Sequence, residues 1–307
     1  MSASANERGL RRGRWGWSEY ESPELPGLPP GVEAVAVAGR EAPLEEADVL
    51  VVPSTVQVDA AAIARLARCR LVITTTSGFD QIDLAALRRA SIACARLPLA
   101  RRDAVVETAL GMMLSLTRRL GSFQEAAHGG RWERPRLAQY GATRLGTVGV
   151  VGVGIIGARL VEVLSALGAR VLRCDPILPD GVALERLLCA SDVVTLHCEL
   201  TDSNRGMIGA REIDSMRRGA VLVNTARGGL LDVEAAVAAV HEERLAGLGL
   251  DVFPSEPADL ARYAGPRVLV TPHAAGWHPQ LGAKIAEGVV EAVRALLEGG
   301  EVPFRVV

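Results

Sequence analysis

The second half of the chain alternates short, almost wholly apolar segments with segments of helical periodicity. A strand with apolar residues on both faces belongs in a parallel sheet that helices cover on both sides. Six such segments, joined by five crossovers, predict a doubly wound Rossmann domain in an α/β chain. They extend over residues 147–151, 170–174, 192–197, 220–224, 247–252 and 268–271.

Helical segments lie between these strands, at residues 156–167, 182–189, 210–216 and 233–243. Asp232 directly precedes the last of them, and its side chain can accept a hydrogen bond from a first-turn N–H group, so we expect it to be an N-cap. A longer helix is predicted at 103–120, where apolar residues repeat every three to four positions. We expect this helix to link two domains and to contribute to a homodimer interface.

The first third of the chain has a smaller pattern of the same kind. Strands are predicted at 32–37, 49–52, 71–75 and 92–95, with helices at 59–68 and 83–90. A final helix at 279–298 is long enough to return to this part of the chain. We therefore predict two domains. Residues 1–100 with 285–307 form a smaller, flavodoxin-like α/β substrate domain, and residues 101–284 form the Rossmann domain.

Composition excludes several classes of protein. The chain has 307 residues with 34 basic and 36 acidic side chains, so it builds no general basic field for nucleic acid or an anionic membrane. The five cysteines form no C-x-x-C pair, and we expect no metal site. No apolar run approaches the ~20 residues of a membrane span, and the start of the chain has no secretory apolar region. A reducing cytoplasm suits this cysteine content best.

Residues 152–157 read G-V-G-I-I-G between a predicted strand and a predicted helix. Gly152 allows a tight turn, Gly154 leaves room for a pyrophosphate, and Gly157 lets the helix approach the strand closely. The helix N-terminus, at Ile155 and Ile156, offers unpaired N–H groups to phosphates. This context predicts a dinucleotide site. The alternatives are a glycine-rich turn that binds no nucleotide, or a site for S-adenosylmethionine.

Asp175 ends the strand that follows this loop, eighteen residues after Gly157. A carboxylate there accepts hydrogen bonds from ribose hydroxyls and repels a 2′-phosphate. The sequence therefore favours NAD(H) over NADP(H) as the cofactor.

Three later segments place polar residues at predicted strand ends, where open parallel sheets bind their ligands. Arg227 follows the strand at 220–224, and its guanidinium can bind a carboxylate and polarise a carbonyl. His273 can transfer a proton, and Glu256 can orient its imidazole. Each residue alone has a structural explanation, but together they supply what hydride transfer to a 2-oxo acid requires.

These segments resemble the D-isomer-specific 2-hydroxyacid dehydrogenases, the family of D-lactate, phosphoglycerate, formate and phosphite dehydrogenases. The similarity extends over nearly the whole chain and is strongest at residues 224–276. It implies an NAD-dependent enzyme that interconverts a 2-oxo acid and a D-2-hydroxy acid, with Arg227, Glu256 and His273 as catalytic residues. It also implies contacts to NAD(H) from His197, Cys198, Thr225, Ala226, Asp251 and His273.

The resemblance further implies that backbone N–H groups of Ser77 and Gly78 bind the substrate carboxylate. Arg101 departs from the family, because similar sequences often have asparagine there. Its guanidinium would suit a second anionic group, such as a distal carboxylate, phosphate or phosphonate. The alternative is that Arg101 is a solvated residue at a helix start.

Two other functions remain open for this scaffold. One is oxidation of phosphite or formate. The other is a regulatory protein that senses NAD(H) and acts on a partner, as some relatives do as corepressors. The homodimer is also the family expectation.

Overall fold

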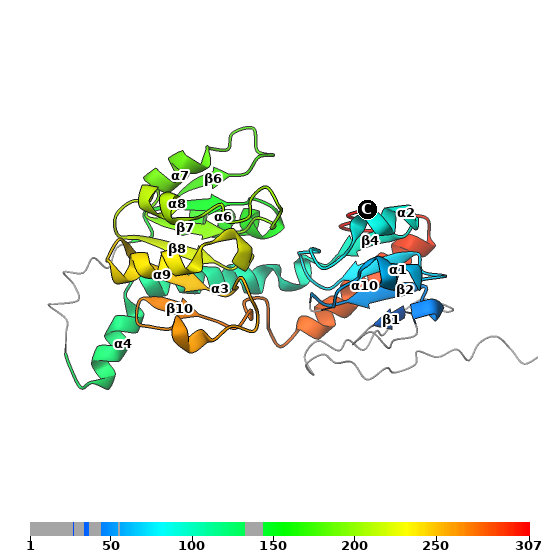
Figure 1. Ribbon diagram of the computed structural model, residues 1–307, viewed down its shortest axis with the longest axis horizontal. Coiled ribbons are helices and arrows are strands. Elements are labelled where there is room, and N and C mark those ends of the chain that lie inside the picture. The colour runs from blue at the N-terminus through cyan, green and yellow to red at the C-terminus, as the bar shows by residue number, and fades with distance from the viewer. Residues whose placement is uncertain (1–26, 28–33, 37–43, 55, 133–143) are drawn as a thin grey trace, which may run out of the picture. The chain divides into compact units, whose positions relative to one another are not determined.

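The computed structural model describes residues 27, 34–36, 44–54, 56–132 and 144–307 (Figure 1). The chain divides into two compact units. The first comprises Met1–Arg101 and His278–Val307, and the second comprises Arg102–Trp277.

The second unit contains a six-stranded sheet in which every neighbouring pair is parallel. Its strands are β5 (Thr147–Val151), β6 (Arg170–Cys174), β7 (Val193–Leu196), β8 (Ala220–Asn224), β9 (Leu245–Leu250) and β10 (Val268–Val270). The order is β10-β9-β8-β7-β5-β6, so the direction of winding reverses between β5 and β7. The predicted doubly wound parallel sheet is confirmed. Ligands of such sheets bind at this reversal, beyond the carboxyl ends of the strands.

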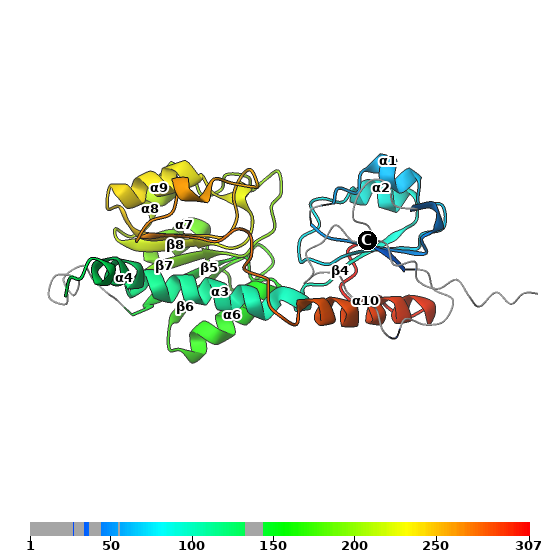
Figure 2. The same ribbon diagram turned by 90° about the horizontal axis from the view of Figure 1, so that it is seen from below.

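Helices cover both faces of this sheet (Figure 2). On one face, apolar residues of α3 (Leu99–Thr117) and α6 (Ile155–Ala166) pack on Val148, Val150 and Val221. On the other face lie α7 (Leu184–Ala190), α8 (Ala210–Ser215) and α9 (Val233–His241). The side chain of Asp232 accepts a hydrogen bond from the N–H of Ala235 at 3.0 Å, as expected of an N-cap. Short 3-10 helices span Gly228–Leu230 and Leu260–Arg262.

The helix predicted at 103–120 differs in both of its ends. It begins at Leu99 and stops at Thr117, and a second helix, α4 (Leu120–His128), follows it. Arg119 separates the two helices because its φ of 56° lies in the left-handed region. The Arg119 guanidinium donates a hydrogen bond to the carbonyl of Ala246 at 2.8 Å, a tertiary contact that the local pattern does not encode.

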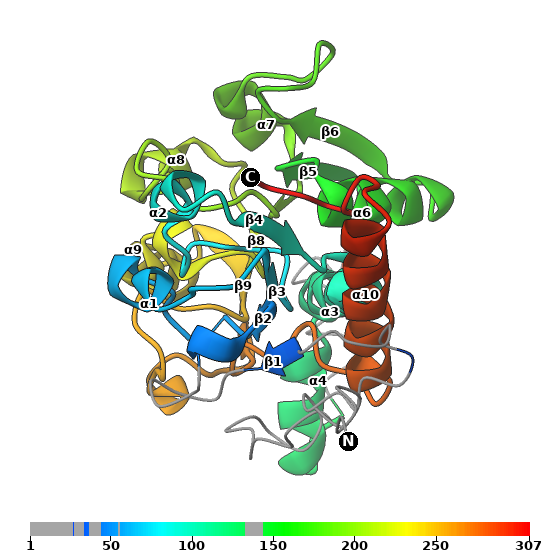
Figure 3. The same ribbon diagram turned by 90° about the vertical axis from the view of Figure 1, so that its right-hand side faces the viewer.

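The first unit contains four parallel strands in sequential order, β1 (Ala34–Ala36), β2 (Val49–Val52), β3 (Leu71–Thr74) and β4 (Ala93–Arg96). Apolar residues of α10 (Leu281–Leu297) pack on one face of this sheet, and those of α1 (Ala60–Ala64) and α2 (Leu84–Arg89) pack on the other (Figure 3). A short 3-10 helix spans Leu44–Glu46. The strand order does not reverse within the described residues, so the flavodoxin-like topology of this unit stays a prediction.

The second boundary between the units lies at 277/278, seven residues before the predicted boundary at 284/285. The first turn of α10 already belongs to the first unit. Leu281 and Ile285 are fully buried there, in one cluster with Val49 and Leu71. Within the described residues, no helix has the length and apolar composition to cross a bilayer.

Candidate functional site

The three candidate catalytic residues follow three neighbouring strands of the second unit. Arg227 comes after β8, Glu256 after β9 and His273 after β10. Because β8, β9 and β10 are parallel neighbours, their carboxyl ends lie at one edge of the sheet. The order of the strands therefore gathers residues that are 46 positions apart in the sequence.

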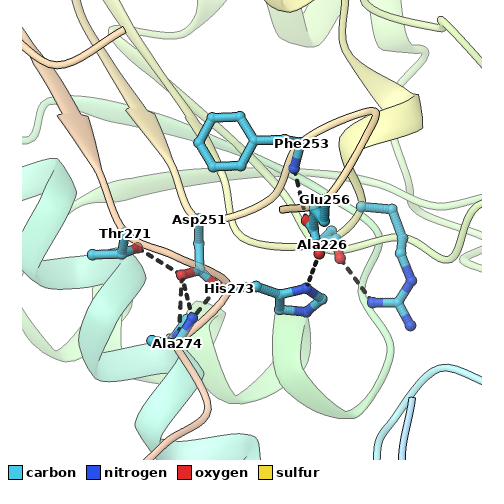
Figure 4. A network of polar contacts seen from close by, with 9 residues as sticks. Ala226, Asp251, Phe253, Glu256, Thr271, His273 and Ala274 are labelled. Carbon is cyan, nitrogen blue, oxygen red and sulfur yellow. Dashed lines mark hydrogen bonds and ion pairs between the residues drawn. The ribbon is translucent and has the colours of Figure 1, made fainter. Parts of the chain in front are cut away.

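His273 and Glu256 form a direct pair (Figure 4). The Nδ1 atom of His273 lies 2.7 Å from Oε2 of Glu256, and the N–H of Phe253 donates to Oε1 of the same carboxylate at 2.9 Å. A carboxylate can only accept, so Nδ1 carries the proton in this contact. Among the described residues, Nε2 of His273 has no hydrogen-bond partner, and the side chain is 43% exposed. Nε2 is therefore the atom that can exchange a proton with a ligand.

The carboxyl of Glu256 is held in its charged form. Burial raises its pKa. Hydrogen bonds from His273 and the N–H of Phe253, together with the charges of His273 and Arg227, lower the pKa by more than burial raises it. The net result is a pKa below the ordinary value. The charges of both Arg227 and His273 act on the Glu256 carboxyl, so the three predicted catalytic residues interact electrostatically.

Asp251 fixes the loop that carries His273. Its carboxylate is 1% exposed and accepts from the hydroxyl of Thr271 at 2.6 Å and from the N–H groups of Ala274 and Ala275 at 2.8 and 3.1 Å. The Asp251 carbonyl accepts from the N–H of His273 at 2.8 Å. His273 has a φ of 53°, which a residue with a Cβ adopts only when its surroundings impose it. Asp251 thus orients this backbone; its contact with the nicotinamide stays a prediction.

Asn224 organises the segment that carries Arg227. Its buried amide donates to the carbonyl of Arg227 at 2.9 Å and accepts from the N–H of Ala226 at 3.0 Å. A Cβ on Gly228 would lie 2.0 Å from the carbonyl carbon of Phe253, so only glycine lets these two loops meet. Asn224 is not among the predicted site residues, although it ends β8 three positions before Arg227.

The three glycines at 152–157 have the backbone geometry that the sequence predicts, and the contact of Gly154 with a pyrophosphate stays a prediction. Gly152 has a φ of 86°, and a Cβ there would lie 2.3 Å from the backbone N of Cys198. A Cβ on Gly157 would lie 2.0 Å from the carbonyl oxygen of Gly152, which reflects the close approach of α6 to its strand. Gly154 has no described atom within 4 Å of a Cβ position. That open space lies at the N-terminus of α6.

The carboxylate of Asp175 is positioned beside this loop. It accepts from the N–H of Val153 at 2.7 Å and from the N–H of Ile177 at 3.1 Å. Arg173, the nearest basic residue in sequence, pairs with Asp180. The carboxylate of Asp175 is therefore held beside the glycine loop, and its contact with a ribose stays a prediction.

His197 and Cys198 follow β7. In the sheet, β7 and β6 lie on opposite sides of β5. Burial lowers the pKa of His197 to about 4, and its Nε2 lies 2.9 Å from the hydroxyl of Thr195, so the ring is neutral near pH 7. Burial raises the pKa of the Cys198 thiol to about 11. Both side chains are therefore uncharged near pH 7, and the backbone of both residues lies next to Gly152.

These features fit a dinucleotide. The open space at Gly154 and the N-terminus of α6 suit a pyrophosphate, and the carboxylate of Asp175 suits a ribose. The hydroxyl of Thr225 is buried and has no partner among the described residues, so it too can bond a ligand. Among the same residues, no three His, Cys, Asp or Glu side chains form a group that could hold a metal ion.

The candidate substrate residues Ser77, Gly78 and Arg101 all belong to the first unit. Ser77 and Gly78 follow β3. Arg101 is 9% exposed, and its Nε lies 3.5 Å from the carbonyl of Thr75. Arg101 is therefore a buried residue that packs beside this loop, which argues against the solvated helix-start alternative.

The NAD-binding domain of the D-isomer-specific 2-hydroxyacid dehydrogenases matches residues 110–275 of the chain. A glycerate dehydrogenase of Methylorubrum extorquens is 32% identical over 252 residues, which cover 77% of this chain and 79% of the relative. A D-3-phosphoglycerate dehydrogenase of Methanocaldococcus jannaschii is 31% identical over 83% of this chain, which spans about half (51%) of that relative's length.

A similar fold occurs in the structure of a D-lactate dehydrogenase from Aquifex aeolicus complexed with NAD and lactic acid. The two chains have a TM-score of 0.75 and 28% identity, and the similarity covers 87% of each chain.

Proposed function

Because the chain belongs to the D-isomer-specific 2-hydroxyacid dehydrogenase family and is an NAD-dependent oxidoreductase, we propose that it interconverts a 2-oxo acid and a D-2-hydroxy acid. One observation carries this proposal. The Nδ1 of His273 is bound to Glu256 at 2.7 Å, while Nε2 has no partner among the described residues. That arrangement is typical of an acid-base catalyst. Residues 1–101 with 278–307 form the substrate domain, and residues 102–277 form the NAD-binding domain.

Arg227 binds the substrate. Its planar guanidinium can hold the carboxylate and the neighbouring carbonyl oxygen together, which polarises the carbonyl. The Asn224 amide and the close contact of Gly228 with Phe253 fix the backbone from which the side chain extends.

His273 transfers the proton. NADH, when bound, supplies the hydride that reaches C2. In reduction, the protonated imidazole donates its Nε2 proton to the oxygen on C2 as charge develops there, and in oxidation the neutral imidazole removes that proton. Glu256 orients the ring through Nδ1 and stabilises its positive charge.

NAD(H) is held by residues around the β5/β7 reversal. Gly152, Gly154 and Gly157 form the loop for the pyrophosphate with Ile155 and Ile156 at the start of α6, and Asp175 binds the ribose hydroxyls. The remaining contacts come from residues that follow β7, β8, β9 and β10, namely His197, Cys198, Thr225, Ala226, Asp251 and His273.

The substrate carboxylate also accepts hydrogen bonds from the N–H groups of Ser77 and Gly78. Arg101 selects a substrate with a second anionic group, such as a dicarboxylate, phosphate or phosphonate. The burial of Arg101 supports this role, because a buried guanidinium binds an anion more strongly than an exposed one.

NADH oxidation measured against a panel of 2-oxo acids, phosphite and formate tests the function. We expect turnover of 2-oxo acids, and a His273→Ala variant should lose roughly 10²- to 10⁴-fold in kcat while its NADH affinity changes little. Turnover of phosphite or formate alone would replace the proposed reaction by one of these. NADH binding without any turnover would indicate an NAD(H) sensor instead.

An Arg101→Ala variant tests the substrate class. Loss of one charge-assisted hydrogen bond should lower kcat/KM for dianionic 2-oxo acids by about tenfold or more, and lower it much less for pyruvate. Equal losses for both classes would refute the role of Arg101 in selection.

We also propose that the protein is a cytoplasmic homodimer. All five cysteines are free thiols, which suits a reducing compartment. Leu114 on α3 and Leu120 and Phe123 on α4 are apolar and exposed (37, 53 and 37%), as in a surface that a second copy covers. Light scattering after size exclusion should give the mass of a dimer for the wild type and of a monomer for the double variant L120E/F123E. A monomeric wild type would refute the dimer.

A further inference from the structure

In the loop at residues 76–79, between β3 and α2, the carbonyls of Ser77 and Gly78 accept hydrogen bonds, whereas the N–H groups of these two residues donate none to the described residues. The carbonyls of Ser77 and Gly78 accept hydrogen bonds from Arg96 and Thr76. In the part of the chain that the structure describes, the N–H groups of Ser77 and Gly78 donate to no acceptor. Successive free N–H groups form a small site of positive potential, which suits an anion.

A directional chain of hydrogen bonds holds one side of this loop. The amide of Gln81 donates to the hydroxyl of Thr74 at 3.0 Å, the hydroxyls of Thr74 and Thr76 are 3.0 Å apart, and Thr76 donates to the carbonyl of Gly78 at 2.9 Å. Thr76 uses its one hydroxyl proton for Gly78, so in the contact between the two hydroxyls Thr74 is the donor. The hydroxyl of Thr74 also lies 3.5 Å from the same Gly78 carbonyl. Gln81 and Thr74 are 5% and 0% exposed, so water competes little with this chain.

Arg96, the last residue of β4, holds the other side. Its Nη1 donates to the carbonyl of Ser77 at 3.0 Å, and its guanidinium carbon lies 5.7 Å from the centre of the Phe79 ring. One side chain thus contacts two positions of the loop, on either side of Gly78. Its positive charge also adds to the attraction of the loop for an anion.

We propose that Arg96 and Thr76 are positioning residues for the substrate carboxylate. They bind the carbonyls of Ser77 and Gly78, which keeps both N–H groups free to bind the carboxylate. The role rests on the proposed function, because it takes the ligand of these N–H groups to be a 2-oxo or 2-hydroxy acid. It differs from direct binding, since neither side chain needs to touch the substrate.

Steady-state kinetics of Arg96 variants test the role of this residue. Arg96→Met should raise KM for the 2-oxo acid by about tenfold, as expected from the loss of one charged hydrogen bond, with a much smaller change in kcat. Arg96→Lys should restore part of the KM, because an ammonium can still donate to Ser77. Arg89→Met, which removes an exposed arginine of α2, is the matched control and should behave like the wild type.

Thr76 variants provide a second test if the Arg96 variants fold poorly. Thr76→Val keeps the shape and removes the donor to Gly78, so it should raise KM severalfold. Thr76→Ser keeps the donor and should restore the KM. Thermal unfolding of all variants separates a loss of folded protein from a loss of positioning.

Binding of oxalate, which cannot be reduced, separates this proposal from the proposed function. On the NADH-loaded protein, oxalate should slow hydrogen exchange of the peptide covering residues 76–80, and Arg96→Met should abolish this effect and weaken oxalate binding. If the wild type reduces no 2-oxo acid but this pattern holds, the proposed function fails and the positioning role stands. Unchanged KM, oxalate affinity and exchange in both Arg96→Met and Thr76→Val would overturn the positioning role.

Discussion

At the scale of single residues, Glu256 determines how His273 can act. Its carboxylate has a lowered pKa and stays charged through the neutral range, and it binds Nδ1 rather than Nε2. The imidazole therefore has one fixed nitrogen and one available nitrogen. The spacing of these residues in the sequence predicts the pair but not which oxygen binds the ring, which depends on the second hydrogen bond from Phe253.

Replacing Glu256 by Gln keeps the shape of the side chain and removes its charge. We expect kcat for reduction to fall by roughly 10²-fold, the lower end of what acid-base catalysis contributes. Steady-state kinetics of reduction measure this loss. Glu301→Gln, on an exposed residue, is the control, and a wild-type kcat for Glu256→Gln would contradict this assignment.

At the scale of elements, the turn between β5 and α6 shows how much a short motif can predict. The three glycines at 152–157 meet three separate demands, namely a positive φ, open space and a close approach of the helix. The hydrogen bonds from the N–H groups of Val153 and Ile177 to Asp175 were not predicted. Every residue except proline has a backbone N–H group, so the residue types do not indicate which of these groups will donate to Asp175.

Alanine variants of two of these glycines should separate ligand binding from folding. Gly154→Ala adds a methyl group in open space at a negative φ, so the thermal midpoint should hold while NADH affinity falls. Gly157→Ala forces a methyl group against the carbonyl of Gly152 and should destabilise the fold by about 1–3 kcal/mol. Calorimetry and NADH fluorescence titration measure the two effects. If Gly154→Ala bound NADH as the wild type does, the pyrophosphate would not lie there.

At the scale of the whole molecule, the chain is two parallel-sheet units joined at 101/102 and 277/278. The predicted α/β architecture, the NAD-binding domain and the family resemblance are all confirmed. The exact end of the second unit was not predictable from periodicity. The apolar periodicity of α10 predicts a helix with one buried face, but it does not indicate which of the two sheets that face packs on.

Global stability should depend on pH through His197. Burial lowers its folded-state pKa to about 4, from 6.5 for the free side chain. Between these values the unfolded chain binds a proton that the folded chain does not, so stability is full above pH 6.5 and falls as the pH drops toward 4. The loss approaches about 1.4 kcal/mol per pH unit.

Thermal unfolding from pH 4.5 to 7.5 measures this dependence. His197→Asn should show a weaker fall below pH 6.5 than the wild type, whereas His128→Asn, on an exposed histidine of α4, should match the wild type. Parallel curves for the wild type and His197→Asn would mean that folding does not lower the pKa of His197.

The sequence by itself determined the parallel sheets, the glycine loop with Asp175, and the order of Arg227, Glu256 and His273 at strand ends. These depend on periodicity, glycine and motif, which are local. Only the tertiary structure decided three other contacts: that of Asp251 with the N–H of Ala274 beside His273, that of Arg119 with the carbonyl of Ala246 at the end of α3, and that of Arg96 with the carbonyl of Ser77. Each of these is a hydrogen bond between segments distant in sequence, and its energy exists only once folding has brought donor and acceptor within about 3 Å.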